Sequence, residues 1–220
     1  MTLKYKCLIV DHDDTAVKSS PEIHYPCFVK TIETFRPGEY ILTLEEFMNV
    51  CFYPNLETYY RNELGFTKEE LALEYEMWRK YAAERVPHFY EGMERILTDF
   101  KAAGGVLAVS SQSHKALIER DYAARTSIAP DFIYGCEIGL DNCKPSPFTV
   151  IDVCEKTGLS PSDVLVVDDL KTGLEMAKRS GAHFAAAGWS HFVPEIRKYM
   201  EENSEFYLRT TDELRTLIFG

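Results

Sequence analysis

The sequence predicts an α/β protein in which a doubly wound, Rossmann-like parallel sheet forms the core and an α-helical cap is inserted into it. Three short apolar runs, Cys7–Val10, Val106–Val109 and Val164–Val167, have the length and composition of strands buried on both faces. After about residue 87, helical patterns alternate with such runs, which is typical of parallel βαβ units. Residues 17–86 show helical patterns only. We therefore expect a core of residues 1–16 and 87–220 and a helical cap of residues 17–86, connected near residues 16–20 and 85–88.

The predicted first strand ends in two carboxylates. Asp11 and Asp13 follow Cys7–Val10 in a polar turn. Ligands of doubly wound sheets bind outside the carboxyl ends of the strands, so we expect both side chains to face one pocket. Aspartate is also common in turns for structural reasons, because its side chain bonds to nearby backbone and tolerates left-handed conformations. That alternative explains this turn alone and leaves the groups after the later strands unexplained.

The predicted cap begins with a helix over residues 22–35, which is ended by the sequence Arg36-Pro37-Gly38. Two further helices are expected to start at capping boxes, in which a threonine and a glutamate three residues later each bind the backbone of the other. These boxes are Thr43 with Glu46 and Thr67 with Glu70. The helix after Thr67 places apolar residues on one face, namely Leu71, Tyr75, Trp78 and Ala82.

The later segments of the core also carry reactive groups. A helix over residues 92–103 leads to Val106–Val109, which is followed by the hydroxyls of Ser110 and Ser111. Lys144 stands beside Pro145, and Val164–Val167 is followed by Asp168 and Asp169. Taken singly, a hydroxyl often caps a helix and an acidic pair often complements a helix dipole. Their joint occurrence in one α/β domain predicts a functional site.

These four segments resemble the motifs of the haloacid dehalogenase-like phosphohydrolase superfamily. The resemblance covers nearly the whole chain and rests on Asp11-x-Asp13-x-Thr15, Ser110, Lys144-Pro145 and Asp168-Asp169. Residues 19–24 and 168–173 are most similar to the phosphoglycolate phosphatase and β-phosphoglucomutase group. This subgroup does not specify the substrate.

Phosphoryl transfer needs a nucleophile, a proton donor and charge neutralisation, and the motifs offer a candidate for each. Asp11 is the expected nucleophile, since a carboxylate can form an aspartyl-phosphate. Asp13 would protonate the leaving oxygen and then deprotonate water, and the resemblance implies the same assignment. Lys144 and Ser110 would bind phosphoryl oxygens through a positive charge and a hydroxyl. Ser111 is a further candidate for substrate binding.

A divalent cation is expected at the same place. Asp11, Asp168 and Asp169 bring negative charges toward an anionic substrate, which requires cations nearby. Oxygen ligands suit Mg²⁺, and no Cys/His cluster in the sequence favours zinc. The resemblance implies that Asp11 and Asp169 bind the metal directly, that Asp13 uses its main-chain carbonyl, and that Asp168 binds directly or through water.

Other positions in the motifs modify this interpretation. Asp13 favours phosphoryl transfer over dehalogenation, because expulsion of halide needs no protonation, and Thr15 resembles the phosphatase form of the motif more than the mutase form. Asp14 stands where the family usually has glycine, so we expect left-handed backbone there. Gly173 stands where many relatives carry aspartate. For His12, contact with the leaving group is one reading, and a side chain facing solvent or cap is the favoured one.

In the cap, His24 and Arg61 are the preferred candidates for substrate contact. His24 shares its near-hinge position with the resembled subgroup. Aromatic residues at helical spacing are more often core than recognition elements, and a helical arginine is usually a solvated charge. The other aromatic and basic side chains of the cap are therefore expected to serve packing or solvation.

Three alternatives to a Mg²⁺-dependent phosphatase acting on a small phosphate ester stay open. The nearest is a phosphosugar mutase of the same superfamily. A receiver-type phosphoacceptor module also uses an acidic pair, a hydroxyl and a lysine, but its acidic pair comes first in the chain, whereas Asp168 and Asp169 come last. A catalytically silent relative is disfavoured by the complete set of motif residues.

Composition excludes several classes of partner. The chain has 35 acidic and 24 basic residues, for a net charge of −11, and no dense basic run, so we expect no nucleic acid partner. No apolar run is long enough to cross a bilayer, and no signal peptide precedes the first strand, so we expect no membrane partner and a cytoplasmic location. Six cysteines without a C-x-x-C pair are expected to be reduced. The oligomeric state is not specified by the sequence.

Overall fold

The computed structural model describes residues 2–220 and contains two compact units. The core unit comprises Met1–Lys18 and His88–Gly220, and the helical unit comprises Ser19–Pro87. The sequence predicted a core of residues 1–16 and 87–220 and a helical cap of residues 17–86.

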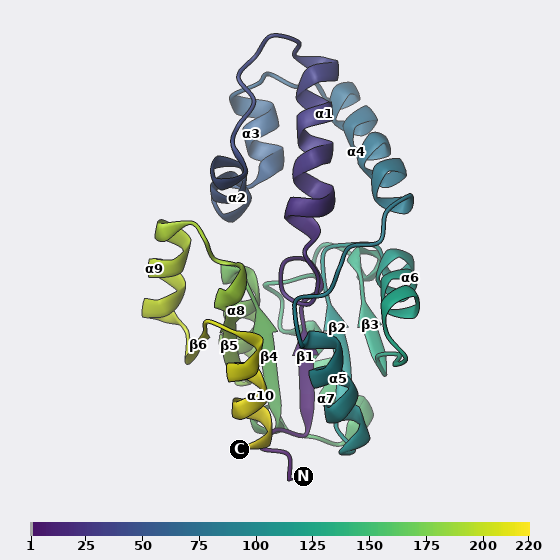
Figure 1. The fold of residues 1–220 in the computed structure, drawn as a ribbon, viewed down its shortest axis with the longest axis vertical. Coiled ribbons are helices and arrows are strands. Elements are labelled where there is room, and N and C mark those ends of the chain that lie inside the picture. The colour runs from purple at the N-terminus through teal and green to yellow at the C-terminus, as the bar shows by residue number, and fades with distance from the viewer. Residues whose placement is uncertain (1) are drawn as a thin grey trace. The chain divides into compact units, whose positions relative to one another are not determined.

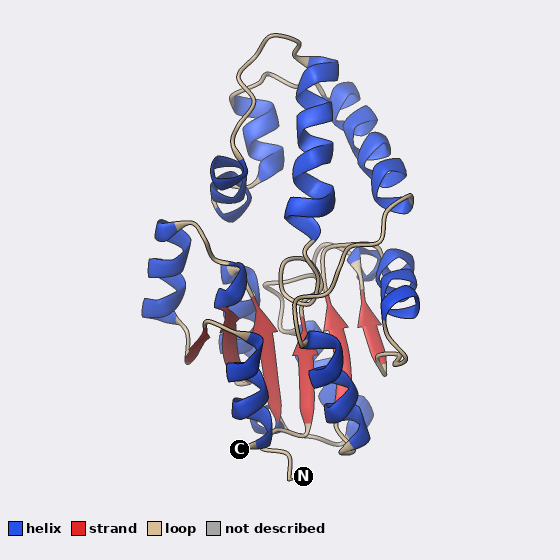
Figure 2. Cartoon of the chain, viewed as in Figure 1, coloured by secondary structure: helices blue, strands red, loops and turns tan. Residues whose placement is uncertain are grey.

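A six-stranded, wholly parallel sheet forms the centre of the core unit (Figures 1 and 2). Its strands are β1 (Cys7–Val10), β2 (Val106–Ser110), β3 (Phe132–Tyr134), β4 (Val164–Asp168), β5 (His183–Ala187) and β6 (Phe206–Leu208). They lie in the order β3-β2-β1-β4-β5-β6, which is that of a doubly wound sheet. The predicted fold class is confirmed.

Helices cover both faces of this sheet (Figure 1). Helices α5 (Met93–Ala102), α6 (Lys115–Arg125) and α10 (Thr211–Phe219) contribute buried side chains to one apolar cluster with the sheet. The strands supply alternate residues to this cluster, such as Leu8 and Val10 of β1, because successive side chains point to opposite faces. Helices α7 (Phe148–Thr157) and α8 (Lys171–Ser180) lie on the other face, and α9 (Pro194–Asn203) lies beside β6.

The register of the central strands brings their carboxyl ends together. Val10 of β1 pairs with Val109 of β2 on one side and with Val167 of β4 on the other. The chain leaves β1 for β2 and later returns to β4 on the opposite side, so the strand order reverses at β1. The residues after these three strands therefore meet at the switch point where ligands of such sheets bind.

The two chain segments that connect to the helical unit run side by side within the core unit. Val17 forms an antiparallel bridge with Phe89, and the amide of Lys18 donates to the carbonyl of His88 at 2.9 Å. These residues lie in or beside the segments expected to connect core and cap.

The helical unit consists of a π-helical turn, η1 (Ser20–His24), and four α-helices: α1 (Tyr25–Phe35), α2 (Leu44–Phe52), α3 (Leu56–Asn62) and α4 (Lys68–Ala83). The predicted first helix ends at Phe35 as expected, and both predicted capping boxes are present. Buried aromatic rings fill the centre of the unit, with Phe28 against Phe47 and Tyr60 stacked on Phe66. In the predicted stripe on α4, Tyr75 is exposed and stacks on Trp78 instead of entering this core.

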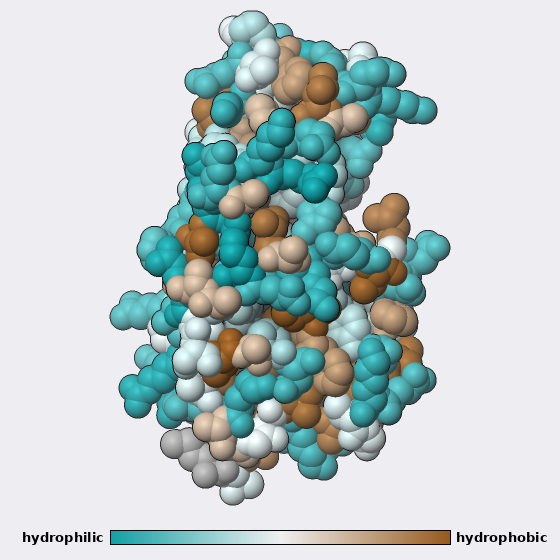
Figure 3. Space-filling model, turned by 90° about the vertical axis from the view of Figure 1, so that its right-hand side faces the viewer, coloured by the Kyte–Doolittle hydropathy of each residue, from teal (hydrophilic) through white to brown (hydrophobic). Residues whose placement is uncertain are grey.

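On the face shown in Figure 3, hydrophilic side chains predominate and apolar ones lie in small separate groups, an ordinary distribution for a globular protein. No helix within residues 2–220 combines the length and the apolar character needed to cross a membrane. All six cysteines are free.

Candidate active site

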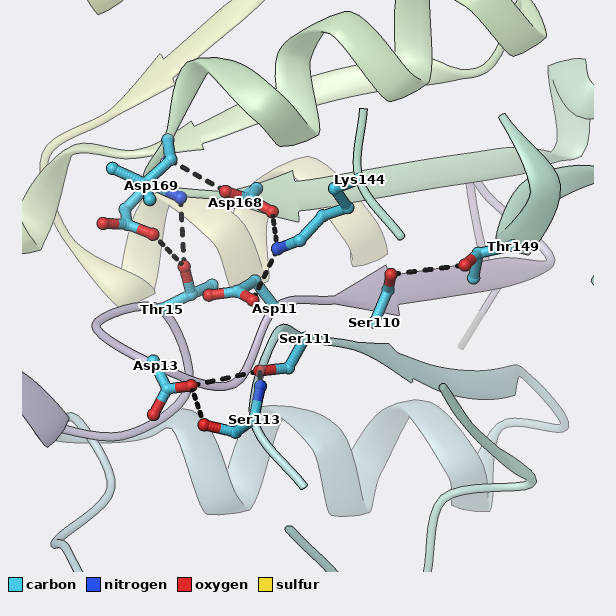
Figure 4. Close-up of polar contacts among 11 residues, drawn as sticks. Asp11, Asp13, Thr15, Ser110, Ser111, Ser113, Lys144, Thr149, Asp168 and Asp169 are labelled. Carbon is cyan, nitrogen blue, oxygen red and sulfur yellow. Dashed lines mark hydrogen bonds and ion pairs between the residues drawn. The ribbon is translucent and has the colours of Figure 1, made fainter. Parts of the chain in front are cut away.

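Lys144 joins carboxylates from two neighbouring strands of the core unit (Figure 4). Its Nζ atom donates to Oδ1 of Asp11 at 2.6 Å and to Oδ2 of Asp168 at 2.5 Å. The side chains of Lys144, Asp11 and Asp168 are only 5%, 6% and 1% exposed. Asp11 directly follows β1, Asp168 ends β4, and Lys144 lies in the loop before α7. The structure thus brings together three predicted residues that are widely separated in the sequence.

Negative charge exceeds positive charge at this point. Burial raises the pKa of Asp11 well above its ordinary value, and the charges of Asp168 and Asp13 raise it further, while Lys144 opposes the change. Burial also raises the pKa of Asp169, and the negative charges of Asp168 and Asp11 raise it further. Although burial alone lowers the pKa of Lys144, the two carboxylates that it contacts raise it above its ordinary value. Lys144 therefore stays protonated but does not neutralise the whole cluster.

Asp11, Asp168 and Asp169 form a group that fits a divalent cation. One carboxylate oxygen of each lies within 4.8 Å of the others, and all three residues are buried. A purely carboxylate set is the donor chemistry that Mg²⁺ prefers. The surplus of buried negative charge is a second reason for a cation here, because like charges held together in a low-dielectric site repel strongly. These residues are three of the four predicted to bind metal, and the fourth, Asp13, was expected to use its main-chain carbonyl.

Asp13 is held by two hydroxyls from the loop after β2. Ser111 donates to Oδ2 of Asp13 at 3.0 Å, and Ser113 donates to the same oxygen at 2.6 Å. Ser111 in turn accepts a hydrogen bond from the amide of Ser113 at 3.0 Å, so the two serines form one unit. This arrangement fixes the direction of the Asp13 carboxylate. The part played by Ser113 was not predicted from the sequence.

Ser110 lies outside the cluster that was predicted to contain it. Its Oγ is 3.3 Å from Oγ1 of Thr149 on α7, away from the carboxylates (Figure 4). The physical reason is the alternation of side chains along β2, which turns Ser110 toward the α7 face. Ser111, the first residue beyond the strand, donates instead to Asp13 in the turn after β1. Of the two serines, Ser111 is the one that contacts a predicted catalytic carboxylate.

Hydrogen bonds from Thr15 and from the backbone before α8 orient the carboxylates of Asp168 and Asp169. Thr15 donates its hydroxyl to Oδ1 of Asp169 at 3.2 Å and accepts from the Asp169 amide at 3.0 Å. The amide of Leu170 donates to Oδ1 of Asp168 at 2.8 Å. A Cβ atom on Gly173 would lie 2.3 Å from Cγ of Asp168, so only glycine allows α8 to approach this carboxylate.

A family model described as haloacid dehalogenase-like hydrolase matches residues 8–187, which include every residue of the site. The chain belongs to the haloacid dehalogenase-like hydrolase family. The match confirms the family resemblance and the predicted enzyme class.

Solved structures share the fold of this hydrolase over nearly its whole length. A predicted phosphoglycolate phosphatase from Haemophilus somnus 129PT has a TM-score of 0.79 at 18% identity, with 99% of each chain covered. A predicted phosphatase from Clostridium acetobutylicum has a TM-score of 0.73 at 17% identity, with 96% of this chain and 97% of that chain covered. CbbY from Rhodobacter sphaeroides, in complex with phosphate, has a TM-score of 0.72 at 18% identity, with 96% of each chain covered. No curated protein matches the sequence.

His12 of the hydrolase is buried in the core unit. It is 2% exposed, its Nε2 lies 3.1 Å from Oδ2 of Asp121 on α6, and its ring stacks on Tyr122. The favoured expectation of a histidine facing solvent or cap is corrected by this burial. His12 ties the turn between Asp11 and Asp13 to α6.

Asp14 adopts the left-handed conformation expected from the sequence, with φ of 57°. Its amide donates to the carbonyl of Val17 at 2.8 Å, which closes the turn after Asp13. The Asp14 charge is also one of the factors that raise the pKa of Asp169, after burial and the charges of Asp168 and Asp11. The residue that replaces the usual glycine therefore adds to the negative charge of the site.

His24 lines a cavity of about 110 Å³ inside the helical unit. Its Nδ1 accepts a hydrogen bond from the indole N–H of Trp78 at 3.1 Å, and the two rings are stacked. Tyr60 and Glu74 also line this cavity. Burial raises the pKa of Glu74 to about 7.

Arg61, the other predicted contact in this unit, is exposed on α3. It forms an ion pair with Glu57 at 2.8 Å, one helical turn away. It is not among the residues that line the cavity. The proposed substrate contacts of His24 and Arg61 stay predictions.

We predict that Glu74→Gln stabilises the protein more at pH 8 than at pH 5. The pKa of Glu74 is about 7 in the folded protein and ordinarily 4.5. The folded state therefore loses stability as pH rises between these values, and the whole loss is present above pH 7. Because glutamine carries no charge, the gain in unfolding free energy should be about 2 kcal/mol larger at pH 8 than at pH 5. Urea unfolding at both pH values measures this difference.

Glu76→Gln is the matched control, because Glu76 lies on the same helix with its side chain 55% exposed. It should show no comparable dependence on pH. Equal effects of Glu74→Gln at the two pH values would show that Glu74 titrates normally in the folded state.

Proposed function

We propose that this chain is a Mg²⁺-dependent phosphatase that hydrolyses a small phosphate monoester through an aspartyl-phosphate on Asp11. The observation that carries the proposal is the contact of Lys144 with Asp11, which is one of three buried carboxylates that lie close together. Membership of the hydrolase family supports the reaction class. The phosphate-bound CbbY, and its mutant solved with xylulose-1,5-bisphosphate, support a small phosphorylated substrate.

In the first step, a carboxylate oxygen of Asp11 attacks phosphorus, and the bond between phosphorus and the leaving oxygen breaks. Lys144 holds Asp11 in position and places a positive charge where negative charge gathers on the phosphoryl oxygens. Ser111, in place of Ser110, offers a hydroxyl to the same oxygens. Protonated Asp13 gives its proton to the leaving alkoxide, so a free alcohol is released.

In the second step, Asp13 takes a proton from water, and the resulting hydroxide attacks the aspartyl-phosphate. The phosphorus–oxygen bond to Asp11 breaks, which releases inorganic phosphate and regenerates the carboxylate. Ser113 keeps the Asp13 carboxylate in one orientation through both steps, while the Ser111 hydroxyl turns to the phosphoryl oxygens.

Asp11, Asp168, Asp169 and the main-chain carbonyl of Asp13 would hold Mg²⁺. When bound, the ion supplies charge neutralisation that lets an anionic substrate approach the carboxylates. Thr15 and the amide of Leu170 keep two of these carboxylates oriented.

Asp11→Asn should abolish turnover while leaving the fold intact. Wild-type protein is assayed against a panel of phosphate monoesters with Mg²⁺, and phosphate release is expected for at least one ester. Loss of the nucleophile should lower kcat by at least about a thousandfold. Asp141→Asn, which changes an exposed loop carboxylate, is the control and should keep full activity. An Asp11→Asn variant within about tenfold of wild type would exclude Asp11 as the nucleophile.

Removal of the metal should be visible in stability as well as in activity. At Mg²⁺ concentrations of about 100 times Kd, binding should raise the unfolding free energy by roughly 2.7 kcal/mol, and chelator should reverse the gain. We expect Asp169→Asn to lose this response and to exceed the wild type in stability without metal, because one repelling charge is gone. Thermal unfolding of both proteins with Mg²⁺ and with chelator tests this. A Tm that does not change on addition of Mg²⁺ would rule out the carboxylate cluster as the Mg²⁺ site.

A further inference from the structure

A second cluster of potential metal ligands lies in the core unit, apart from the three carboxylates. His114, Cys136 and Glu137 each offer one donor atom, and these atoms lie within 4.8 Å of one another. Nδ1 of His114 is 2.8 Å from Oε1 of Glu137 and 3.4 Å from Sγ of Cys136. Imidazole nitrogen, thiol sulfur and carboxylate oxygen therefore converge on one point.

Backbone contacts hold this convergence in place. His114 directly precedes α6, and Cys136 begins the 3₁₀ turn η2 (Cys136–Ile138), which follows β3. The amide of Cys136 donates to the carbonyl of Ser113 at 3.0 Å, and the amide of Lys115 donates to both carboxylate oxygens of Glu137. The loop after β3 is thus bonded to the start of α6 on both sides of His114.

Gly135 makes the close approach of the two segments possible. A Cβ atom at this position would lie 2.5 Å from the amide nitrogen of Lys115 and 2.6 Å from Oε2 of Glu137. No side chain fits between these groups, so glycine is required for the cluster to form. The cluster is accessible from outside, since the side chains of His114 and Glu137 are 25% and 50% exposed.

The separation of the His114 nitrogen and the Cys136 sulfur is close to that expected around a tetrahedral zinc ion. Bond lengths of about 2.0 Å to nitrogen or oxygen and about 2.3 Å to sulfur place nitrogen and sulfur about 3.5 Å apart, and nitrogen and oxygen about 3.3 Å apart. The observed separations are 3.4 Å and 2.8 Å. The shorter nitrogen–oxygen separation is that of the hydrogen bond between His114 and Glu137, which a bound metal ion would replace.

The donor types also distinguish this cluster from the carboxylate site. A thiolate and an imidazole select zinc and related transition metals, whereas carboxylates alone suit Mg²⁺. The chain holds a comparison pair without a thiol: Nδ1 of His183 lies 2.9 Å from Oε1 of Glu205.

We propose that His114, Cys136 and Glu137 bind a divalent transition-metal ion of the zinc class at a site separate from the Mg²⁺ cluster. This inference is independent of the proposed phosphatase activity. The site adjoins catalytic machinery, because His114 follows Ser113, whose hydroxyl donates to Asp13. Occupation of the cluster would bind the loop after β2 to the loop after β3.

Titration with Co²⁺ tests the proposal, since Co²⁺ occupies zinc sites and its thiolate complexes have a charge-transfer band in the near ultraviolet. The reduced protein is titrated in saturating Mg²⁺, which fills the carboxylate cluster. We expect a thiolate band that saturates at about one Co²⁺ per chain. Cys136→Ser should abolish the band, and His114→Gln should weaken Co²⁺ binding by at least about tenfold. Zn²⁺ should displace Co²⁺ and remove the band.

His183→Gln is the matched control, because it removes a histidine from the pair that lacks a thiol. It should leave the band and the affinity unchanged. The absence of a thiolate band in the folded wild-type protein would overturn the proposal. A band of wild-type intensity in Cys136→Ser, with circular dichroism showing a folded variant, would overturn it as well.

Discussion

The buried contact of the Lys144 ammonium with Asp11 and Asp168 is the interaction on which the site depends. Without it, carboxylates from β1 and β4 would face each other across a few ångströms of low-dielectric space. A buried ion pair costs desolvation energy on both sides and is weak grounds for stability by itself. Its value here is positional, because one cation directs two carboxylates toward a common point. The remaining surplus of negative charge is the reason for proposing a Mg²⁺ ion at this point.

The sheet explains why these groups meet at all. The strands are parallel and the strand order reverses at β1, so the residues that follow β1, β2 and β4 lie at one edge of the sheet. Neighbouring residues then orient each of these side chains. Thr15 orients Asp169, the Ser111–Ser113 unit orients Asp13, and the absence of a side chain at Gly173 leaves room for Asp168. Many of the motif residues therefore orient the carboxylates, and only a few are proposed to take part in the reaction.

Local sequence patterns were sufficient to predict the fold class and both capping boxes. The meeting of Asp11, Lys144, Asp168 and Asp169 was predicted from the groups along the chain together with the resemblance to the family motifs. These features depend on local patterns or on the topology that such patterns imply. Other features depend on partners that are distant in the sequence. His12 contacts Asp121 in the interior, and Ser113 donates a hydrogen bond to Asp13. No local sequence pattern indicates either contact.

The assignment of Ser110 shows a further limit of sequence reasoning. An apolar run followed by two serines marks the end of a strand, but a shift of one residue reverses the face to which a side chain points. Only the register of β2 decides that Ser110 turns toward Thr149 and Ser111 toward Asp13. The cluster of His114, Cys136 and Glu137 is equally invisible in the sequence, because α6 and β3 separate His114 from the other two residues along the chain.

The central claim is that Asp11 accepts the phosphoryl group and that Asp13 is needed to remove it. Asp13→Asn should therefore be phosphorylated by an aryl phosphate, whose leaving group needs little protonation, and should lose that phosphoryl group slowly. Intact-protein mass spectrometry after rapid acid quench, followed by reductive labelling of the acyl phosphate, measures both the amount and the position of the modification. The account predicts one phosphoryl group per chain, on Asp11. Phosphorylation of another residue, or none with a substrate that the wild type hydrolyses, would contradict it.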